Sequence, residues 1–129
     1  MDWKIVTIKQ DDALKFLHDN HADREVIFIR PCDEWIAVYD NNILVGVTGI
    51  NHKKADDSLM SVDCTYVCKN YRARGILKAF YAYIMNKFPD SDFVIYCRPI
   101  AAHVVKKYYG FHVTQTWANG TEKCVLRRR

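Results

Sequence analysis

The sequence lacks a hydrophobic run long enough to cross a membrane as a helix. Its longest candidate, Ile43–Ile50, is interrupted by Thr48 and two glycines, whereas a transmembrane helix needs roughly 18 apolar residues. The first residues, Met1–Lys4, also lack the apolar core of a secretory signal peptide. We therefore expect a protein that has no membrane partner and resides in the cytoplasm.

Glycine and proline are scarce, with 5 and 3 among the 129 residues. This scarcity excludes collagen-like and low-complexity chains. The sequence is 50% hydrophobic and 26% charged, which is typical of a folded globular core. A chain of this length fits one domain, so we predict a single domain over residues 1–129, present as a monomer or a homodimer.

The charge is nearly balanced. The 19 Lys and Arg residues against 15 Asp and Glu give a net charge of +4, part of which lies in Arg127–Arg129. Such an excess is compatible with an anionic ligand, but it does not by itself indicate a nucleic-acid partner.

Cysteine occurs without the spacings that signal special chemistry. The five cysteines are an odd number, form no Cys-x-x-Cys pair and stand at no zinc-ligand spacing with histidine. We therefore predict no metal site, and reduced thiols that are neither catalytic nor disulfide-bonded. These residues are Cys32, Cys64, Cys68, Cys97 and Cys124.

Hydrophobic periodicity predicts an α/β fold in the order β-α-β-β-β-α-β-α-β-β, a mixed sheet with helices on both faces. The run at 26–29 is apolar but of undecided type, and the polar segment 53–58 is expected to be a connection. Helices are predicted at 10–20, 76–88 and 99–109, and strands at 3–8, 35–39, 43–50, 59–67, 93–97, 111–117 and 122–127.

A basic loop joins the predicted strand 59–67 to the predicted helix 76–88. Arg72 and Arg74 supply positive charge, and Gly75 lets the backbone approach a bulky anion. The helix that follows presents unpaired N–H groups and the positive end of its dipole. These features favour a phosphate or pyrophosphate site, and the alternative is a solvated basic loop.

This segment resembles motif A of the GNAT superfamily of acyl-CoA-dependent N-acyltransferases, Arg/Gln-x-x-Gly-x-Gly/Ala. Here the motif reads Arg72-Ala73-Arg74-Gly75-Ile76-Leu77, with Leu77 in place of the second glycine. The segment Pro99–Phe111, which ends in Gly110-Phe111, is similar to motif B of the same family. The resemblance implies a GNAT-like mixed, mostly antiparallel sheet of six to seven strands with helices on both faces.

The resemblance also implies a co-substrate, acetyl-CoA, and the backbone groups that bind it. The backbone of Thr65, Tyr66 and Val67 would pair with the pantetheine arm. Main-chain amides would hold the pyrophosphate, and they belong to Arg72, Ala73, Arg74, Gly75, Ile76, Leu77 and Lys78.

Asp63 is the candidate general base, because alternation places it with Ser61 and Thr65 on the cofactor-facing side of the strand. It would accept the proton of the amine directly or through a water that Ser61 could hold. The alternative is a strand-edge acid that pairs with an arginine or a lysine.

The acid that protonates the leaving thiolate has two candidates. Many family members carry a tyrosine four residues before the glycine of motif B, and this position is Lys106. Tyr108 is the nearest phenol, but it lies about 200° further round a regular helix. Both residues can also be ordinary features of a helix end.

The sequence therefore predicts an N-acetyltransferase that transfers an acetyl group from acetyl-CoA to a primary amine, of a small molecule or a peptide, in a ternary complex. The alternative is a catalytically silent GNAT-fold module that binds a protein or nucleic-acid partner. Leu77 and Lys106 favour the silent module, whereas the intact Arg72–Gly75 segment favours the enzyme.

Overall fold

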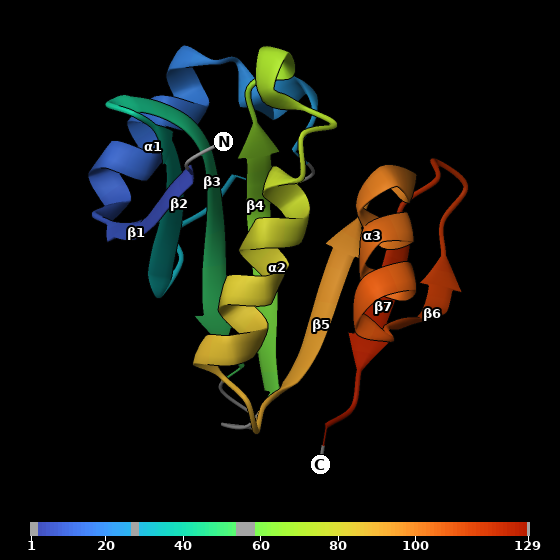
Figure 1. The fold of residues 1–129 in the computed structure, drawn as a ribbon. Coiled ribbons are helices and arrows are strands. Elements are labelled where there is room, and N and C mark those ends of the chain that lie inside the picture. Colours follow the sequence, from blue (N-terminus) through green and yellow to red (C-terminus); the bar gives the residue numbers. More distant parts are fainter. Residues whose placement is uncertain (1–2, 27–28, 54–58, 129) are drawn as a thin grey trace. The chain divides into compact units, whose positions relative to one another are not determined.

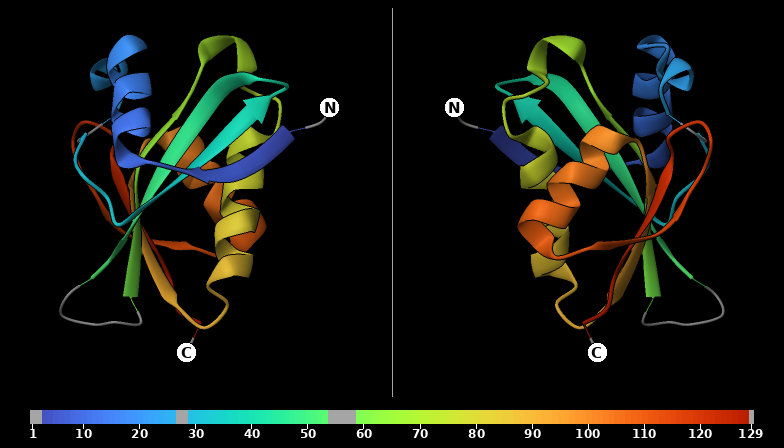
Figure 2. Two further views of the ribbon diagram at one scale, coloured as in Figure 1. Left: turned by 90° about the vertical axis from the view of Figure 1, so that its left-hand side faces the viewer. Right: turned by 90° about the vertical axis from the view of Figure 1, so that its right-hand side faces the viewer.

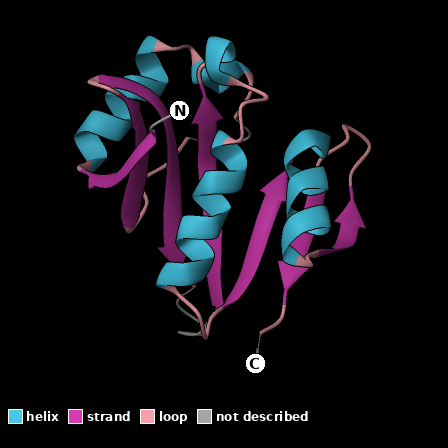
Figure 3. Ribbon diagram, viewed as in Figure 1, coloured by secondary structure: helices cyan, strands magenta, loops and turns pink. Residues whose placement is uncertain are grey.

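The computed structural model of the protein describes residues 3–26, 29–53 and 59–128. Within these residues the chain forms seven strands, three α-helices and two short 3₁₀ helices (Figures 1 and 3). In chain order they are β1 (Trp3–Ile8), α1 (Gln10–Asp19), η1 (Ala22–Arg24), β2 (Glu34–Asp40), β3 (Ile43–His52), β4 (Leu59–Val67), η2 (Lys69–Tyr71), α2 (Ile76–Lys87), β5 (Asp92–Cys97), α3 (Pro99–Tyr109), β6 (His112–Thr116) and β7 (Glu122–Leu126).

The strands form one mixed sheet in the order β1-β2-β3-β4-β5-β7-β6. Antiparallel pairing joins β1 to β2, β2 to β3, β5 to β7, and β7 to β6, whereas β4 and β5 run parallel. The mostly antiparallel seven-stranded sheet confirms the predicted fold class. Each predicted helix and strand is present, with ends that differ by one or two residues.

The hairpin between β2 and β3 forms where the polar turn predicted it. Asp40 pairs with Ile43, and Asn41 between them has a φ of 57°. Asparagine tolerates this left-handed conformation better than most residues do. The turn therefore fixes the register of two strands whose central residues, among them Ala37 and Val47, are fully buried.

The chain divides into two compact units, the first made of Met1–Asn51 and Asp63–Ile76. In this unit α1 contacts β2, and its apolar stripe supplies Phe16 and Leu17 to a core cluster. Trp35 of β2 and Tyr66 of β4 belong to the same cluster, in which the Phe16 and Tyr66 rings meet edge to face at 6.1 Å. Figure 2 shows α1 with the neighbouring strands in its left view.

The second unit consists of His52–Val62 and Leu77–Arg129. Its helix α3 contacts β5 and β7 and buries Ala102 and Val105 completely. Pro99 occupies the start of this helix and Gly110 ends it with a φ of 75°, as the sequence predicted. At the end of β7, the backbone N–H of Arg128 donates to the buried Asp92 carboxylate at 2.7 Å.

One feature of β4 departs from the predicted alternation. Cys64 has a φ of 58°, whereas strict alternation needs an extended backbone at every residue. The face that period-two spacing assigned to Ser61, Asp63 and Thr65 therefore does not continue across Cys64.

Two sequence expectations lie partly outside the described residues, namely the undecided run at 26–29 and the connection at 53–58. The short helices η1 and η2 were not predicted. No helix in the described part of the chain is both long and apolar enough to span a membrane.

Candidate functional site

The connection between β4 and α2 takes a path set by two residues with a left-handed backbone. Ala73 has a φ of 62° and Gly75 a φ of 90°. Ala73, Arg74 and Gly75 are consecutive exposed residues, and the chain enters α2 at Ile76, which is buried. Left-handed residues beside right-handed ones turn successive N–H groups toward one side and create an anion-binding concavity. The path thus favours an anion at the start of α2.

Gly75 is required by its backbone conformation rather than by close packing. A Cβ built on Gly75 meets no atom within 4 Å. A positive φ of 90° is nevertheless strained for any other residue. The space beside Gly75 within the described structure is therefore open, as a site for a bulky anion requires.

Arg72 is engaged by the protein itself. Its Nη1 and Nη2 each donate to a different oxygen of Glu25 at 2.8 Å, and its Nε donates to the carbonyl of Val67 at 2.9 Å. The guanidinium carbon also lies 5.3 Å from the centre of the Tyr66 ring. Glu25 raises the pKa of Arg72 through these hydrogen bonds. The side chain of Arg72 thus fastens the loop to β4 and to the segment after η1.

Arg74 has a different environment from Arg72. Its guanidinium lies 5.2 Å from the centre of the Tyr71 ring, and the Tyr71 hydroxyl donates to Asp40 at 2.9 Å. The ring of Trp3 on β1 also packs against that of Tyr71 in an edge arrangement, with the ring centres 5.9 Å apart. The stacked Tyr71 supports Arg74, and among the described residues no carboxylate forms a salt bridge with it. Arg74 is the arginine of the loop whose charge is available to a ligand.

Lys78, in the first turn of α2, is brought together with the end of α3. Its Nζ lies 4.1 Å from the centre of the Tyr108 ring. The hydroxyl of the neighbouring Tyr109 donates to the Lys78 carbonyl at 2.8 Å, and burial raises the pKa of that phenol. Sequence reasoning missed Tyr109, because an aromatic residue at a helix end is usually a packing residue.

Asp63, the predicted base, is held by two side chains. Arg30 Nη2 and Asn51 Nδ2 each donate to Asp63 Oδ2 at 2.9 Å. The Asp63 side chain is 11% exposed, compared with 47% for that of Arg30. Hydrogen bonding to Asp63 raises the pKa of Arg30. The structure thus places Asp63 in an ion pair with an arginine, which was the alternative to a free base.

The C-terminal part of β4 extends beyond its ladder with β5. The parallel pairing runs from Leu59 opposite Asp92 to Val62 opposite Ile95, whereas β4 continues to Val67. In this extension the Thr65 hydroxyl is 2.8 Å from the hydroxyl of Thr48 on β3. The predicted pantetheine-binding residues Thr65, Tyr66 and Val67 all lie in this extension.

The two candidate acids lie on α3 with different partners. Lys106 Nζ is 3.9 Å from Glu122 Oε1 on β7. Tyr108 is 47% exposed, and besides Lys78 it has Lys107 Nζ at 5.3 Å from its ring centre. Tyr108, rather than Lys106, therefore contacts another predicted site residue.

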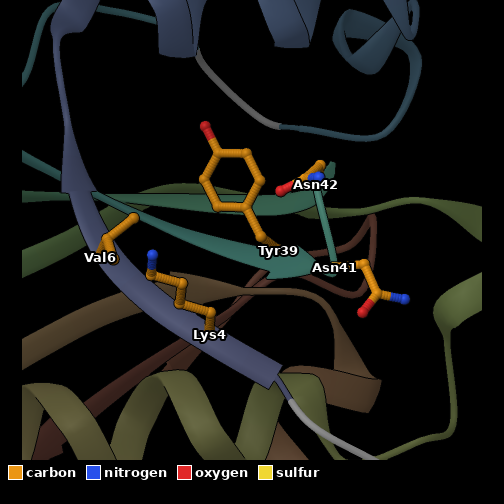
Figure 4. A pocket seen from close by; sticks show the side chains of 5 residues that line it. All are labelled: Lys4, Val6, Tyr39, Asn41 and Asn42. Atoms are coloured by element: carbon orange, nitrogen blue, oxygen red, sulfur yellow. The ribbon is translucent and has the colours of Figure 1, made fainter.

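A separate shallow pocket of about 180 Å³ lies beside β1 and the β2–β3 turn. Lys4, Val6, Tyr39, Asn41 and Asn42 line it, and Figure 4 shows the β1 side chains extending beside the Tyr39 ring. None of these residues belongs to the predicted site. No cluster of three or more histidine, cysteine, aspartate or glutamate residues within 3–26, 29–53 and 59–128 is arranged to hold a metal ion.

Neither a protein-family model nor a curated protein matches the sequence. Solved structures match it over nearly its whole length. An N-acetyltransferase of Staphylococcus aureus Mu50 has a TM-score of 0.79 at 14% identity, with all of both chains covered. A GNAT-family acetyltransferase of the same organism has a TM-score of 0.72 at 12% identity, covering 99% of this chain and 100% of that one.

A third match is a protein of Salmonella typhimurium described as an acetyltransferase and solved with its cofactor acetyl-CoA. It has a TM-score of 0.75 at 13% identity and covers 98% of this chain and 94% of the other. The chain therefore has an acetyltransferase fold. In particular, it has the GNAT fold, which the two sequence motifs predicted.

Proposed function

We propose that the protein is an N-acetyltransferase that moves an acetyl group from acetyl-CoA to a primary amine within a ternary complex. The observation that carries this proposal is the β4–α2 connection, where two left-handed residues, Ala73 and Gly75, precede a helix N-terminus. This arrangement stands on a GNAT fold, and one structure with that fold is described with acetyl-CoA as its cofactor.

The residues of the connection suit the pyrophosphate of acetyl-CoA. Amides from Ala73 to Lys78 would bind the phosphate oxygens, aided by the dipole of α2. Arg74 would add a charge, because it has a stacking partner and no carboxylate partner in the described structure. Arg72 would act as a positioning residue, since Glu25 and the Val67 carbonyl occupy its donors. Leu77, at the position of the second motif glycine, contributes its amide.

The extension of β4 beyond Val62 would bind the pantetheine arm. Its backbone groups at Thr65, Tyr66 and Val67 lie past the end of the ladder with β5. An extended arm can pair with such a strand as an added strand does. A main-chain N–H near Thr65 would then donate to the oxyanion that forms on the thioester carbonyl.

In the transfer step the amine nitrogen attacks the thioester carbon, a C–N bond forms and the C–S bond breaks. The amine loses one proton, and we assign its acceptance to Asp63, directly or through a water. Arg30 and Asn51 fix the position of the carboxylate through Oδ2.

The departing thiolate takes up a proton, and we assign Tyr108 as its donor. Tyr108 is half-exposed and contacts Lys78 of the α2 N-terminus, whereas Lys106 is directed to Glu122. Lys106 is the second candidate because it occupies the position of the family tyrosine.

A catalytically silent module that binds a protein or nucleic acid is the alternative, and Leu77 and Lys106 favour it. Two of the basic C-terminal residues, Arg127 and Arg128, nevertheless have partners within the chain. Arg127 Nη1 is 3.5 Å from Asp92 Oδ2, and Arg128 Nη1 donates to the carbonyls of Met85 and Phe88 at 3.1 and 3.2 Å. These contacts make Arg127 and Arg128 part of the fold rather than a free basic tail.

The test is release of CoA thiol from acetyl-CoA in the presence of a panel of small amines, polyamines and peptides. The enzyme proposal requires amine-dependent thiol release together with a product heavier by one acetyl group. Binding of acetyl-CoA without transfer to any amine would favour the silent module. A protein that binds no acetyl-CoA would contradict the proposed cofactor site.

A further inference from the structure

Two of the five free cysteines, Cys32 and Cys64, lie together in the first unit although they are far apart in sequence. Both thiols point to the same backbone oxygen, because Cys32 Sγ lies 3.6 Å and Cys64 Sγ 3.9 Å from the carbonyl of Arg30. Each of the two thiols also shifts the pKa of the other. Both sulfur atoms therefore lie beside one carbonyl oxygen.

Residues of strand β3 leave space for the Cys32 side chain and bind it. A Cβ added to Gly49 would lie 2.9 Å from Cys32 Cβ and would also collide with Cys32 Sγ. Asn51 Nδ2 donates to Cys32 Sγ at 3.4 Å, and the Cys32 backbone N–H donates to Gln10 Oε1 at 2.9 Å. The absence of a side chain at Gly49 thus leaves room for the thiol, and hydrogen bonds hold it there.

The backbone of Cys64 is unusual. Its φ of 58° is rare for a residue other than glycine, and it occurs inside β4. Cys64 is 6% exposed, whereas Cys32 is only half-buried. The pair therefore combines a buried sulfur atom with one that solvent can reach.

The protonation of the pair differs from that of the other close pair, Cys97 and Cys124. The hydrogen bond from Cys32 lowers the pKa of the Cys64 thiol and raises that of Cys32. Cys97 and Cys124 lie 3.7 Å apart, Sγ to Sγ, but burial raises the pKa of both. Because the thiolate is the reactive form of cysteine, the two pairs are expected to differ in chemistry.

We propose that Cys32 and Cys64 form an oxidation site in which a peroxide converts the two thiols to a disulfide. One of the two sulfurs attacks a peroxide oxygen as its thiolate, the O–O bond breaks, and hydroxide leaves and takes up the proton released by that thiol. The other sulfur then attacks the sulfenic acid so formed, the S–O bond breaks and the S–S bond forms. The proton of the second thiol leaves with the hydroxide as water, so two thiols are oxidised, one peroxide is reduced and two waters form.

The disulfide has a consequence for Asp63. Asn51 Nδ2 donates both to Cys32 Sγ and to Asp63 Oδ2, and Arg30 supplies both the carbonyl beside the thiols and the guanidinium on Asp63. A Cys32–Cys64 bond changes this shared network. This consequence rests on the proposed function and predicts slower acetyl transfer in the oxidised protein.

The test treats the full-length protein with dilute hydrogen peroxide, alkylates the remaining thiols and maps the disulfide by peptide mass spectrometry. We expect an intact mass lower by two hydrogen atoms and a single cross-linked peptide pair containing Cys32 and Cys64. Cys32→Ser and Cys64→Ser are each expected to abolish this product. Serine is close in size to cysteine, so neither substitution should disturb the packing. The matched control is the Cys97→Ser/Cys124→Ser variant, which retains the product.

In the oxidised wild-type protein, Cys68, Cys97 and Cys124 are expected to remain thiols and therefore to be found alkylated. Five alkylated cysteines after peroxide treatment, or a cross-link between any other pair, would overturn the proposal. The intact mass and the mapped cross-link are both measured on the wild-type protein. They depend neither on acetyl transfer nor on the folding of a variant. If the disulfide forms but transfer is unchanged, the oxidation site stands and its link to Asp63 is wrong.

Discussion

Arg72 and Glu25 form a two-pronged ion pair, in which each terminal guanidinium nitrogen donates to a separate carboxylate oxygen at 2.8 Å. The pair links the motif A loop to a segment that lies 47 positions earlier in the sequence. Such fork-to-fork contacts fix orientation as well as charge. The motif arginine thus holds the loop in place, and in the proposed site the backbone amides are left to bind the ligand.

The Arg72–Glu25 pair predicts the direction in which acetyl-CoA affinity changes when either side chain is replaced. If Arg72 positions the loop through Glu25, Glu25→Gln and Arg72→Gln both weaken acetyl-CoA binding, and the double variant is no weaker than either one. If Arg72 instead bound the pyrophosphate, removing Glu25 would free it and strengthen binding. Titration calorimetry of the three variants decides between these outcomes. Because both side chains are more than one-third exposed, we expect the coupling in the free energy of unfolding to be at most about 1 kcal/mol.

Asp63→Asn is expected to lower turnover while leaving the acetyl-CoA dissociation constant nearly unchanged. A general base contributes roughly 10²–10⁴-fold to the rate, and the ion pair with Arg30 favours the lower end of that span. Asp33→Asn serves as the control, because Asp33 is an exposed acid in the same unit. Steady-state kinetics provides the measurement, and an unchanged turnover number in Asp63→Asn would exclude the assignment.

Substitutions of the two tyrosines at the end of α3, Tyr108 and Tyr109, are expected to have different effects. Tyr108→Phe removes an exposed hydroxyl and should slow transfer without lowering stability. Tyr109→Phe removes the bond to the Lys78 carbonyl and should cost about 1 kcal/mol of stability, together with some acetyl-CoA affinity. Lys106→Ala is compared in the same assay over a pH series. If Lys106→Ala alone loses rate, Lys106 is the acid and Tyr108 is structural.

The buried pair Cys97 and Cys124 predicts a loss of stability at alkaline pH. Burial raises the pKa of both thiols in the folded protein, whereas unfolded cysteine ionises near pH ~8.5. Above that pH the unfolded chain releases protons that the folded chain keeps, so the free energy of unfolding falls as the pH rises. Urea unfolding at several pH values measures the slope. Replacing both residues by alanine should flatten it, and an identical slope in that variant would contradict this explanation.

The sequence predicted the fold because its signals are local. The Pro99 start and Gly110 end of α3, and the Asp40–Asn42 turn, are short-range features that the structure confirms. The seven-stranded, mostly antiparallel sheet followed from the order of these elements and from the resemblance to the family.

The site was only partly predictable because its side-chain partners are distant in sequence. Nothing near Arg72 or Asp63 in the chain indicates that Glu25 and Arg30 are their partners. The sequence also does not indicate the positive φ of Cys64 and Ala73, since neither residue is a glycine. Period-two spacing therefore assigned a continuous face to β4 that Cys64 interrupts.

The most direct test of the central claim compares acetyl-CoA stabilisation in two glycine variants. Gly75 and Gly120 share a φ of 90°, and a Cβ on either meets no atom closer than 3.9 Å. Gly75→Glu and Gly120→Glu should therefore strain the backbone equally, but only Gly75→Glu places bulk and negative charge where the pyrophosphate is expected. Differential scanning calorimetry with and without acetyl-CoA measures the difference.

At a ligand concentration a hundredfold above the dissociation constant, the wild-type protein should gain about 2.7 kcal/mol of stability. Gly120→Glu should keep this gain and Gly75→Glu should lose it. A wild-type protein whose melting temperature does not respond to acetyl-CoA, or a Gly75→Glu variant that responds as Gly120→Glu does, would contradict the proposed site.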